Sequence, residues 1–267
     1  MEMVGRWPKA VFYDSHTTLF DWGWCWRTAV TRLLERYGVA TNAEAFLGTW
    51  QRLFSGEQRK SAFASYRPLS ELVAEALELA CQVHGLPGKR EDARVFFELQ
   101  EQVRPFPEVE QELQRQQAMG LKVLIFSNVE RRYLERYVSH FGRFQPDLLA
   151  SSEEAGVHKP NPRAYRWVLG RVGLEPREVL YCASPGFDVA GAMSVGMLAV
   201  WLRRPEADHT REGRLGPEPA ADFESDSLQE LTELLRRLRG GQSDGLGEKR
   251  KGGWYTWRAG GGFGGGG

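Results

Sequence analysis

Short apolar runs alternate with longer amphipathic segments along most of the chain. Runs rich in β-branched and aromatic residues predict buried strands at residues 10–14, 122–128, 179–184 and 198–202, with a fifth, weaker strand at 147–151. Between them, apolar residues that recur every three or four positions predict helices at 109–120, 131–142 and 162–173. Strands that alternate with helices are typical of an α/β fold, in which helices cover both faces of a parallel sheet.

The pattern changes between residues 23 and 105, where strand-like runs stop and amphipathic helical segments follow one another. This region is predicted to be an α-helical cap, inserted after the first strand of a core domain formed by residues 1–22 and 106–239. From residue 240 onward the chain is rich in glycine, which loses more conformational freedom on folding than any other residue. We therefore expect residues 240–267 to form a disordered tail.

The charge of the 267-residue chain is balanced, with 35 Lys and Arg residues against 35 Asp and Glu residues. Zero net charge gives no long-range field to attract nucleic acid or an anionic membrane, so we expect a small-molecule partner. Cys25, Cys81 and Cys182 are odd in number and widely spaced, which fits neither a disulfide framework nor a zinc site. The sequence has no apolar run of about 18 residues either. These features favour a cytoplasmic protein.

Polar residues gather where the predicted strands end. Asp14 directly follows the first strand, Ser127 and Asn128 close the second, and Asp188 follows the 179–184 strand by a few residues, while Lys159 lies in the segment GVHKPNPRAY. Each has an ordinary structural explanation when taken singly, as a helix cap, a turn residue or a surface charge. The carboxyl ends of parallel strands share one edge of the sheet, however, and ligands bind at that edge. These residues are therefore candidates for a single site.

Their order and spacing resemble the motifs of the haloacid dehalogenase superfamily. The matching residues are Asp14, Thr18 and Leu19 after the first strand, Lys159, Pro160, Pro162 and Tyr165 in the third motif, and Asp188, Gly191 and Ala192 in the fourth. The resemblance implies a Rossmann-like parallel sheet with an inserted helical cap. It also implies a hydrolase in which Asp14 is the nucleophile.

Two positions distinguish the branches of that superfamily. Its phosphatases carry a second acid two residues after the nucleophile and a magnesium-binding acid in the fourth motif, where this chain has His16 and Ala183. The 2-haloacid dehalogenases lack both acids, and the chain resembles them further in Phe20-Asp21 and Ser127-Asn128. The resemblance therefore implies a hydrolase that needs no metal or cofactor. Asp14 would displace halide from the α-carbon of a 2-haloalkanoic acid, and water activated by Asp188 would hydrolyse the ester to a 2-hydroxy acid.

The resemblance assigns roles to the remaining candidates. Lys159 would keep Asp14 ionised and stabilise the oxyanion, and Thr18 would orient Asp14. Ser127 and Asn128 would hold the carboxylate of a small substrate. The other expected substrate-binding residues are Arg52, which would receive the leaving halide, together with Tyr165, Ser184 and Trp22.

Three alternatives stay open from the sequence. The chain departs from the dehalogenase pattern at His16, Ala183 and Pro185, so the same chemistry could open the ring of azetidine-2-carboxylate, with His16 as the proton donor. A phosphatase-like enzyme and a non-catalytic binding module are the other two. Asp14, Lys159 and Asp188 argue against the binding module, because gathering three charges in one cleft is costly without a use. Similar dehalogenases are often dimers, so a homodimer is also open.

Overall fold

A parallel sheet forms the centre of the protein in the computed structural model, which describes residues 7–39, 41–204 and 220–239. Within these residues, six strands are arranged in the order β3-β2-β1-β4-β5-β6, and every neighbouring pair is parallel. The strands are β1 (Ala10–Tyr13), β2 (Lys122–Ser127), β3 (Leu148–Ser151), β4 (Val179–Ala183), β5 (Leu198–Leu202) and β6 (Phe223–Ser225). The predicted α/β class is confirmed, and β6 is a strand that the sequence pattern did not predict.

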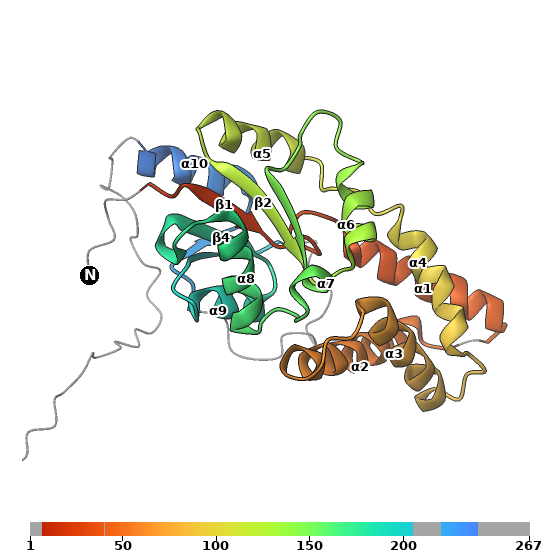
Figure 1. The fold of residues 1–267 in the computed structure, drawn as a ribbon. Coiled ribbons are helices and arrows are strands. Elements are labelled where there is room, and N and C mark those ends of the chain that lie inside the picture. Colours follow the sequence, from red (N-terminus) through yellow and green to blue (C-terminus); the bar gives the residue numbers. More distant parts are fainter. Residues whose placement is uncertain (1–6, 40, 205–219, 240–267) are drawn as a thin grey trace, which may run out of the picture.

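Helices cover both faces of the sheet, as Figure 1 shows. The face that carries Val11 and Tyr13 packs against α5 (Val109–Ala118) and α10 (Leu228–Arg239). The opposite face, with Phe12 and Tyr181, packs against α8 (Pro162–Val172) and α9 (Gly186–Met193). Side chains alternate between the faces along each strand, so neighbouring residues of β1 belong to different clusters. Between core and cap lie α6 (Arg131–Val138) and the short α7 (Ser152–Ala155).

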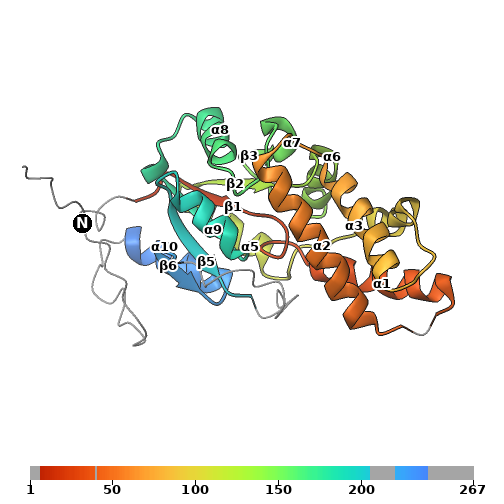
Figure 2. The ribbon, with the colours of Figure 1, turned by 90° about the horizontal axis from the view of Figure 1, so that it is seen from below.

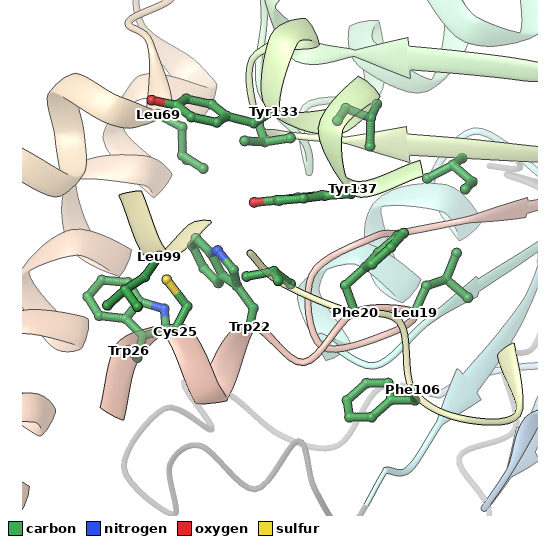
Figure 3. Close-up of a cluster of buried hydrophobic side chains, with 14 of the residues drawn as sticks. Leu19, Phe20, Trp22, Cys25, Trp26, Leu69, Leu99, Phe106, Tyr133 and Tyr137 are labelled. Carbon is green, nitrogen blue, oxygen red and sulfur yellow. The ribbon is translucent and has the colours of Figure 1, made fainter. Parts of the chain in front are cut away.

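Four helices form the cap: α1 (Trp22–Tyr37), α2 (Ala43–Phe63), α3 (Leu69–Val83) and α4 (Arg94–Gln100). Aromatic side chains hold them together, with the ring centroid of Trp26 4.8 Å from that of Trp50 and 4.6 Å from that of Phe96. In Figure 3, Trp22 lies between Trp26 of the cap and Tyr137 of α6, so the apolar interior continues from cap to core. None of the helices in the described residues has both the length and the apolar character needed to cross a bilayer.

The cap is seated on the carboxyl edge of the sheet through residues 62–70, which comprise the end of α2, the connection to α3 and the start of α3, and which Figure 2 shows beside the core. Among the described residues, three core side chains bond to backbone groups of this segment. Asn161 Nδ2 donates to Ala62 O (2.7 Å), His158 Nε2 donates to Arg67 O (2.8 Å), and Glu130 Oε1 accepts from Ser70 N (3.1 Å). The cap therefore covers the edge at which the predicted polar residues lie. Residues 240–267, predicted as a disordered tail, lie outside the described residues.

Candidate active site

Asp14 stands at the end of β1, where a tight turn directs the following residues back over it. Its backbone N–H donates to Cys182 O (3.1 Å), which continues the ladder with β4. The turn requires a left-handed backbone at Thr17 (φ 62°), a strained conformation for a β-branched residue and one that is typical of functional loops. Thr18 Oγ1 then donates to Asp14 Oδ2 (2.8 Å) and accepts from the backbone N–H of Ser184 (2.9 Å). The hydroxyl of Thr18 thus fixes the orientation of the Asp14 carboxylate, as predicted.

Lys159 lies between two carboxylates. Its Nζ is 2.9 Å from Asp14 Oδ1 and 2.6 Å from Asp188 Oδ2, and it also donates to Phe126 O (2.8 Å) and Tyr181 Oη (2.9 Å). Burial alone would lower the pKa of Lys159, but the two carboxylates outweigh burial and hold the pKa above its ordinary value. The ammonium therefore stays charged, and residues from four distant segments meet at one cation.

Two tyrosines enclose Asp188. Tyr165 Oη donates to Asp188 Oδ1 (2.7 Å), and Tyr181 Oη donates to Asp188 Oδ2 (3.0 Å). Burial raises the pKa of both phenols well above the ordinary value, so both stay protonated and act as donors. Asp188 is consequently held on both oxygens by neutral donors in addition to the ammonium of Lys159.

Asp14 is the most exposed member of this charged cluster, at 5% against 1% for both Lys159 and Asp188. Burial and the negative charge of Asp188 raise the pKa of Asp14, Lys159 and the hydrogen bond from Thr18 lower it, and the net result is a rise from 3.8 to about 6. Asp14 is therefore ionised at neutral pH. A carboxylate that is ionised and oriented, and that is the most exposed of its cluster, is suited to act as a nucleophile.

His16 and Trp22 stack face to face beside this cluster, with ring centroids 3.7 Å apart and planes inclined by 4°. His16 Nε2 lies 3.1 Å from Tyr137 Oη. Burial lowers the pKa of His16 well below its ordinary value, and Lys159 lowers it further. His16 is therefore neutral at neutral pH. The buried indole Nε1 of Trp22 has no hydrogen-bond partner within the described residues.

Asn128 holds the loop that carries Lys159. Its Nδ2 donates to Lys159 O (3.0 Å), and its Oδ1 accepts from Lys159 N (2.8 Å) and Ser152 Oγ (2.6 Å). Ser127 Oγ forms a hydrogen bond with Ser15 Oγ (2.6 Å). Both side chains are thus engaged within the protein. The geometry makes Asn128 a positioning residue, and the expected role of the pair in holding a substrate carboxylate stays a prediction.

Comparison with known proteins agrees with this architecture. A family model described as haloacid dehalogenase-like hydrolase matches residues 27–182. The chain belongs to this family. The family and the capped sheet predicted from the motifs are therefore confirmed.

The relatives of this haloacid dehalogenase-like hydrolase include proteins named as dehalogenases and proteins named as phosphatases. (S)-2-haloacid dehalogenase 1 of Pseudomonas sp. (strain CBS-3) is 26% identical over 233 residues, which cover 86% of this chain and 97% of the relative. Phosphoserine phosphatase of Thermus thermophilus is 30% identical over 203 residues, covering 73% and 76%. The solved L-2-haloacid dehalogenase from Xanthobacter autotrophicus is 25% identical with a TM-score of 0.70, covering 86% and 98%.

Magnesium, which phosphatases of this family require, does not fit the donor set of this hydrolase. The facing oxygens of Asp14 and Asp188 both accept from Lys159 Nζ, and Ala183 offers no side-chain ligand. No group of three His, Cys, Asp or Glu residues in the described part of the chain could hold a metal ion. Magnesium is usually held by one or two carboxylates, with water completing its octahedral shell, and here both candidate carboxylates are engaged with Lys159.

The role expected of Arg52, which is to receive the leaving halide, stays a prediction. Its side chain is exposed on α2, and Nη2 donates to Thr49 Oγ1 (3.3 Å) one turn earlier on the same helix. The preceding residue, Gln51, is buried, and its Oε1 has no hydrogen-bond partner within the described residues. Successive side chains on a helix differ in direction by about 100°. Gln51, and not Arg52, therefore faces the interior of the hydrolase.

Sequence reasoning missed Tyr181 as part of the site. Tyr181 lies inside β4 and appeared only as an apolar strand residue. Side chains two positions apart on a strand share a face, so Tyr181 points to the same side as Ala183, the position that carries an acid in phosphatases. That alternation is the signal that could have identified it.

Ser184 contributes mainly through its backbone. Its N–H donates to Thr18, and its carbonyl accepts from Trp201 Nε1 (3.1 Å). The buried Oγ of Ser184 has no hydrogen-bond partner within the described residues. Its expected contact with substrate stays a prediction.

Proposed function

We propose that this protein hydrolyses 2-haloalkanoic acids to 2-hydroxy acids through an ester formed on Asp14. The observation that carries the proposal is the ammonium of Lys159 held between Asp14 and Asp188, with Asp14 the most exposed of the three. An organic ammonium keeps the nucleophile ionised, and it occupies the position between the facing oxygens of the two carboxylates. The dehalogenase names of relatives that align over most of the chain support the same assignment.

In the first step, an oxygen of Asp14 attacks the α-carbon of the substrate. A carbon–oxygen bond forms while the carbon–halogen bond breaks, and the halide leaves with the bonding electron pair. No proton is needed, because halide is a stable anion. The carboxylate is prepared for this attack by Thr18 on Oδ2 and by Lys159 on Oδ1, which fix its orientation.

In the second step, water attacks Cγ of the Asp14 ester. The carbonyl oxygen becomes an oxyanion beside the Lys159 ammonium, which stabilises the developing charge in a site with little water. Asp188 accepts the proton of the attacking water. Collapse of the intermediate breaks the bond from Cγ to the substrate oxygen, which takes the proton of the new carboxyl group and leaves as the 2-hydroxy acid. Asp14 is again a carboxylate and Asp188 releases its proton to solvent, so the enzyme returns to its initial state.

The neutral state of His16 removes one source of the proton that a ring nitrogen would need as a leaving group, whereas halide needs none and a ring amine that is already protonated carries its own. Opening of a nitrogen ring requires a proton at the departing amine, and the pKa of His16 is lowered well below its ordinary value by burial and by Lys159. The imidazole is therefore not an acid at neutral pH. It is stacked on Trp22 and forms part of a flat, uncharged surface next to the charged cluster.

The proposal is tested by chloride release from (S)-2-chloropropionate in buffer that contains EDTA. Wild-type protein should release chloride and form lactate, and the rate should not change when magnesium replaces EDTA. Azetidine-2-carboxylate and p-nitrophenyl phosphate, the substrates of the alternative functions, are assayed in separate parallel reactions. Ring-opened product from the first, or magnesium-dependent phosphate release from the second without chloride release, would contradict the proposal.

The nucleophile is tested with a matched pair of variants. Asp14→Asn should abolish chloride release, whereas Asp21→Asn should retain it, because Asn also caps a helix and Asp21 accepts from Trp24 N (2.9 Å) at the start of α1. A single turnover in water labelled with oxygen-18 should place the label in the peptide that contains Asp14. Label in lactate and none in that peptide would exclude the ester.

A further inference from the structure

Tyr181 is a buried, hydrogen-bonded group that none of the sequence motifs includes. We propose that its hydroxyl is a positioning group for the second half of the reaction, where it donates a hydrogen bond to Asp188 and so frees an N–H group of Lys159 for Asp14. This inference rests on the proposed function, because it concerns the hydrolysis of the Asp14 ester. The side chain belongs to β4, is fully buried, and enters the cluster from the face covered by α8 and α9.

The hydroxyl of Tyr181 joins the base to the cation. Its oxygen accepts from Lys159 Nζ (2.9 Å), and its hydrogen is donated to Asp188 Oδ2 (3.0 Å). A phenol can accept and donate at the same time, whereas a carboxylate or a carbonyl can only accept. Tyr181 is therefore the one acceptor of Lys159 in the described residues that can pass a hydrogen bond on to another member of the cluster.

The ammonium of Lys159 has fewer hydrogens than neighbours. It carries three N–H groups, but within the described residues four acceptors lie 2.6 to 2.9 Å from Nζ, namely Asp14 Oδ1, Phe126 O, Tyr181 Oη and Asp188 Oδ2. At any moment one acceptor lacks a full hydrogen bond. When that acceptor is Asp188, the hydroxyl of Tyr181 still supplies a donor to the same oxygen.

This arrangement matters most after the ester has formed. Asp14 then loses its negative charge, and Asp188 becomes the only carboxylate in direct contact with Lys159 among the described residues. An ammonium drawn wholly to Asp188 would leave the ester oxygen without stabilisation. By donating to Asp188 Oδ2, Tyr181 supplies a hydrogen bond to that oxygen, so that an N–H of Lys159 can turn to the ester oxygen instead.

The charged and titratable groups around Tyr181 are few. Asp14 reaches it from the end of β1, Lys159 from the loop before α8, Asp188 from α9 and Tyr165 from α8. Tyr165 is 5.5 Å away between ring centroids and donates to the other oxygen of Asp188, so it does not substitute for the hydroxyl of Tyr181. A change at Tyr181 should therefore appear in the titration of the carboxylate pair.

The test compares Tyr181→Phe with Tyr13→Phe. Both residues are fully buried, and each variant loses a hydrogen-bonded phenol hydroxyl, but Tyr13 donates to Gln116 Oε1 (2.6 Å) on the opposite face of the sheet. We expect Tyr181→Phe to move the acid limb of the kcat profile for (S)-2-chloropropionate upward by about one pH unit. Its KM should change by less than about twofold, since the hydroxyl does not touch the substrate. Tyr13→Phe should leave the profile unchanged.

A second measurement does not require turnover. Carbon-13 NMR of aspartate-labelled protein should show the coupled titration of the Asp14 and Asp188 pair at higher pH in Tyr181→Phe than in wild type and Tyr13→Phe. If Tyr181→Phe does not fold, 3,5-difluorotyrosine at position 181 retains the hydroxyl as a stronger donor and should move the titration to lower pH. Identical titrations in all proteins would overturn the inference. Absence of chloride release from wild type would instead reject the proposed function, and the titration would still decide the role of Tyr181.

Discussion

Replacement of Lys159 by Met tests the charged cluster most directly. Met fills a similar volume but removes the ammonium, so Asp14 and Asp188 would face each other without the cation between them. Breaking a buried ion pair by removal of one partner costs about 3–5 kcal/mol. We therefore expect Lys159→Met to lower the free energy of unfolding by about that amount at pH 8, where the carboxylates are ionised.

The size of this loss should depend on pH, with a sign that follows from the pKa shifts. The pKa of Lys159 is raised above its ordinary value, so the stability that its charge contributes is fully present at lower pH. That stability is lost only as pH rises through the raised pKa, which lies above pH 8. The pKa of Asp14 is raised from 3.8 to about 6, so protonated Asp14 favours the folded state, and this stability is lost as pH rises through 6. A rise of about two units in the pKa of Asp14 corresponds to about 3 kcal/mol of free energy of unfolding. At pH 5 Asp14 can take a proton, so the loss of unfolding free energy in Lys159→Met should be less than half of the loss at pH 8.

The assay is urea unfolding at pH 5 and pH 8, followed by tryptophan fluorescence. Lys122→Met is the matched control, because Lys122 is exposed at the start of β2 and should cost less than about 1 kcal/mol at either pH. A loss of equal size at both pH values, or a loss below about 1 kcal/mol at pH 8, would refute the argument that Lys159 offsets two ionised buried carboxylates.

Two further predictions concern groups that hold the cluster in place. Thr18→Val removes the donor to Asp14 Oδ2 and should lower kcat about 10- to 100-fold with little change in KM, whereas Thr18→Ser should recover most of the rate in a chloride-release assay. Asn128→Ala leaves Ser152 Oγ and the backbone of Lys159 without their partner and should lower the free energy of unfolding by about 2–3 kcal/mol in urea. A loss under about 0.5 kcal/mol would show that Asn128 does not fix the Lys159 loop.

Residues that close a predicted strand could be placed from sequence, because the carboxyl ends of parallel strands share an edge. This is why Asp14 and Asp188 were expected in one site before any contact was known. The function of Asn128 could not be predicted in this way, since its partners are backbone atoms of a loop 31 residues later. The direction of Arg52 could not be predicted either, because one position on a helix decides between the interior and the surface.

The last strand of the described residues shows a second limit of sequence patterns. β6 (Phe223–Ser225) contains Phe, Glu and Ser, which is too short and too polar to give an apolar run. It pairs with β5 through backbone hydrogen bonds, and the pairing depends on the edge that β5 already offers. Strands of this kind are specified by the rest of the sheet more than by their own residues.

The seating of the cap has a consequence for how this enzyme could change over evolution or in the laboratory. Core side chains hold residues 62–70, from the end of α2 to the start of α3, but this segment contributes backbone atoms, such as the carbonyls of Ala62 and Arg67. Backbone groups are present whatever the side chain, so substitutions in this segment leave those bonds available. A library of variants across residues 62–70 could therefore sample new substrate preferences while the core, with Asn161 and His158, keeps the cap in register over Asp14.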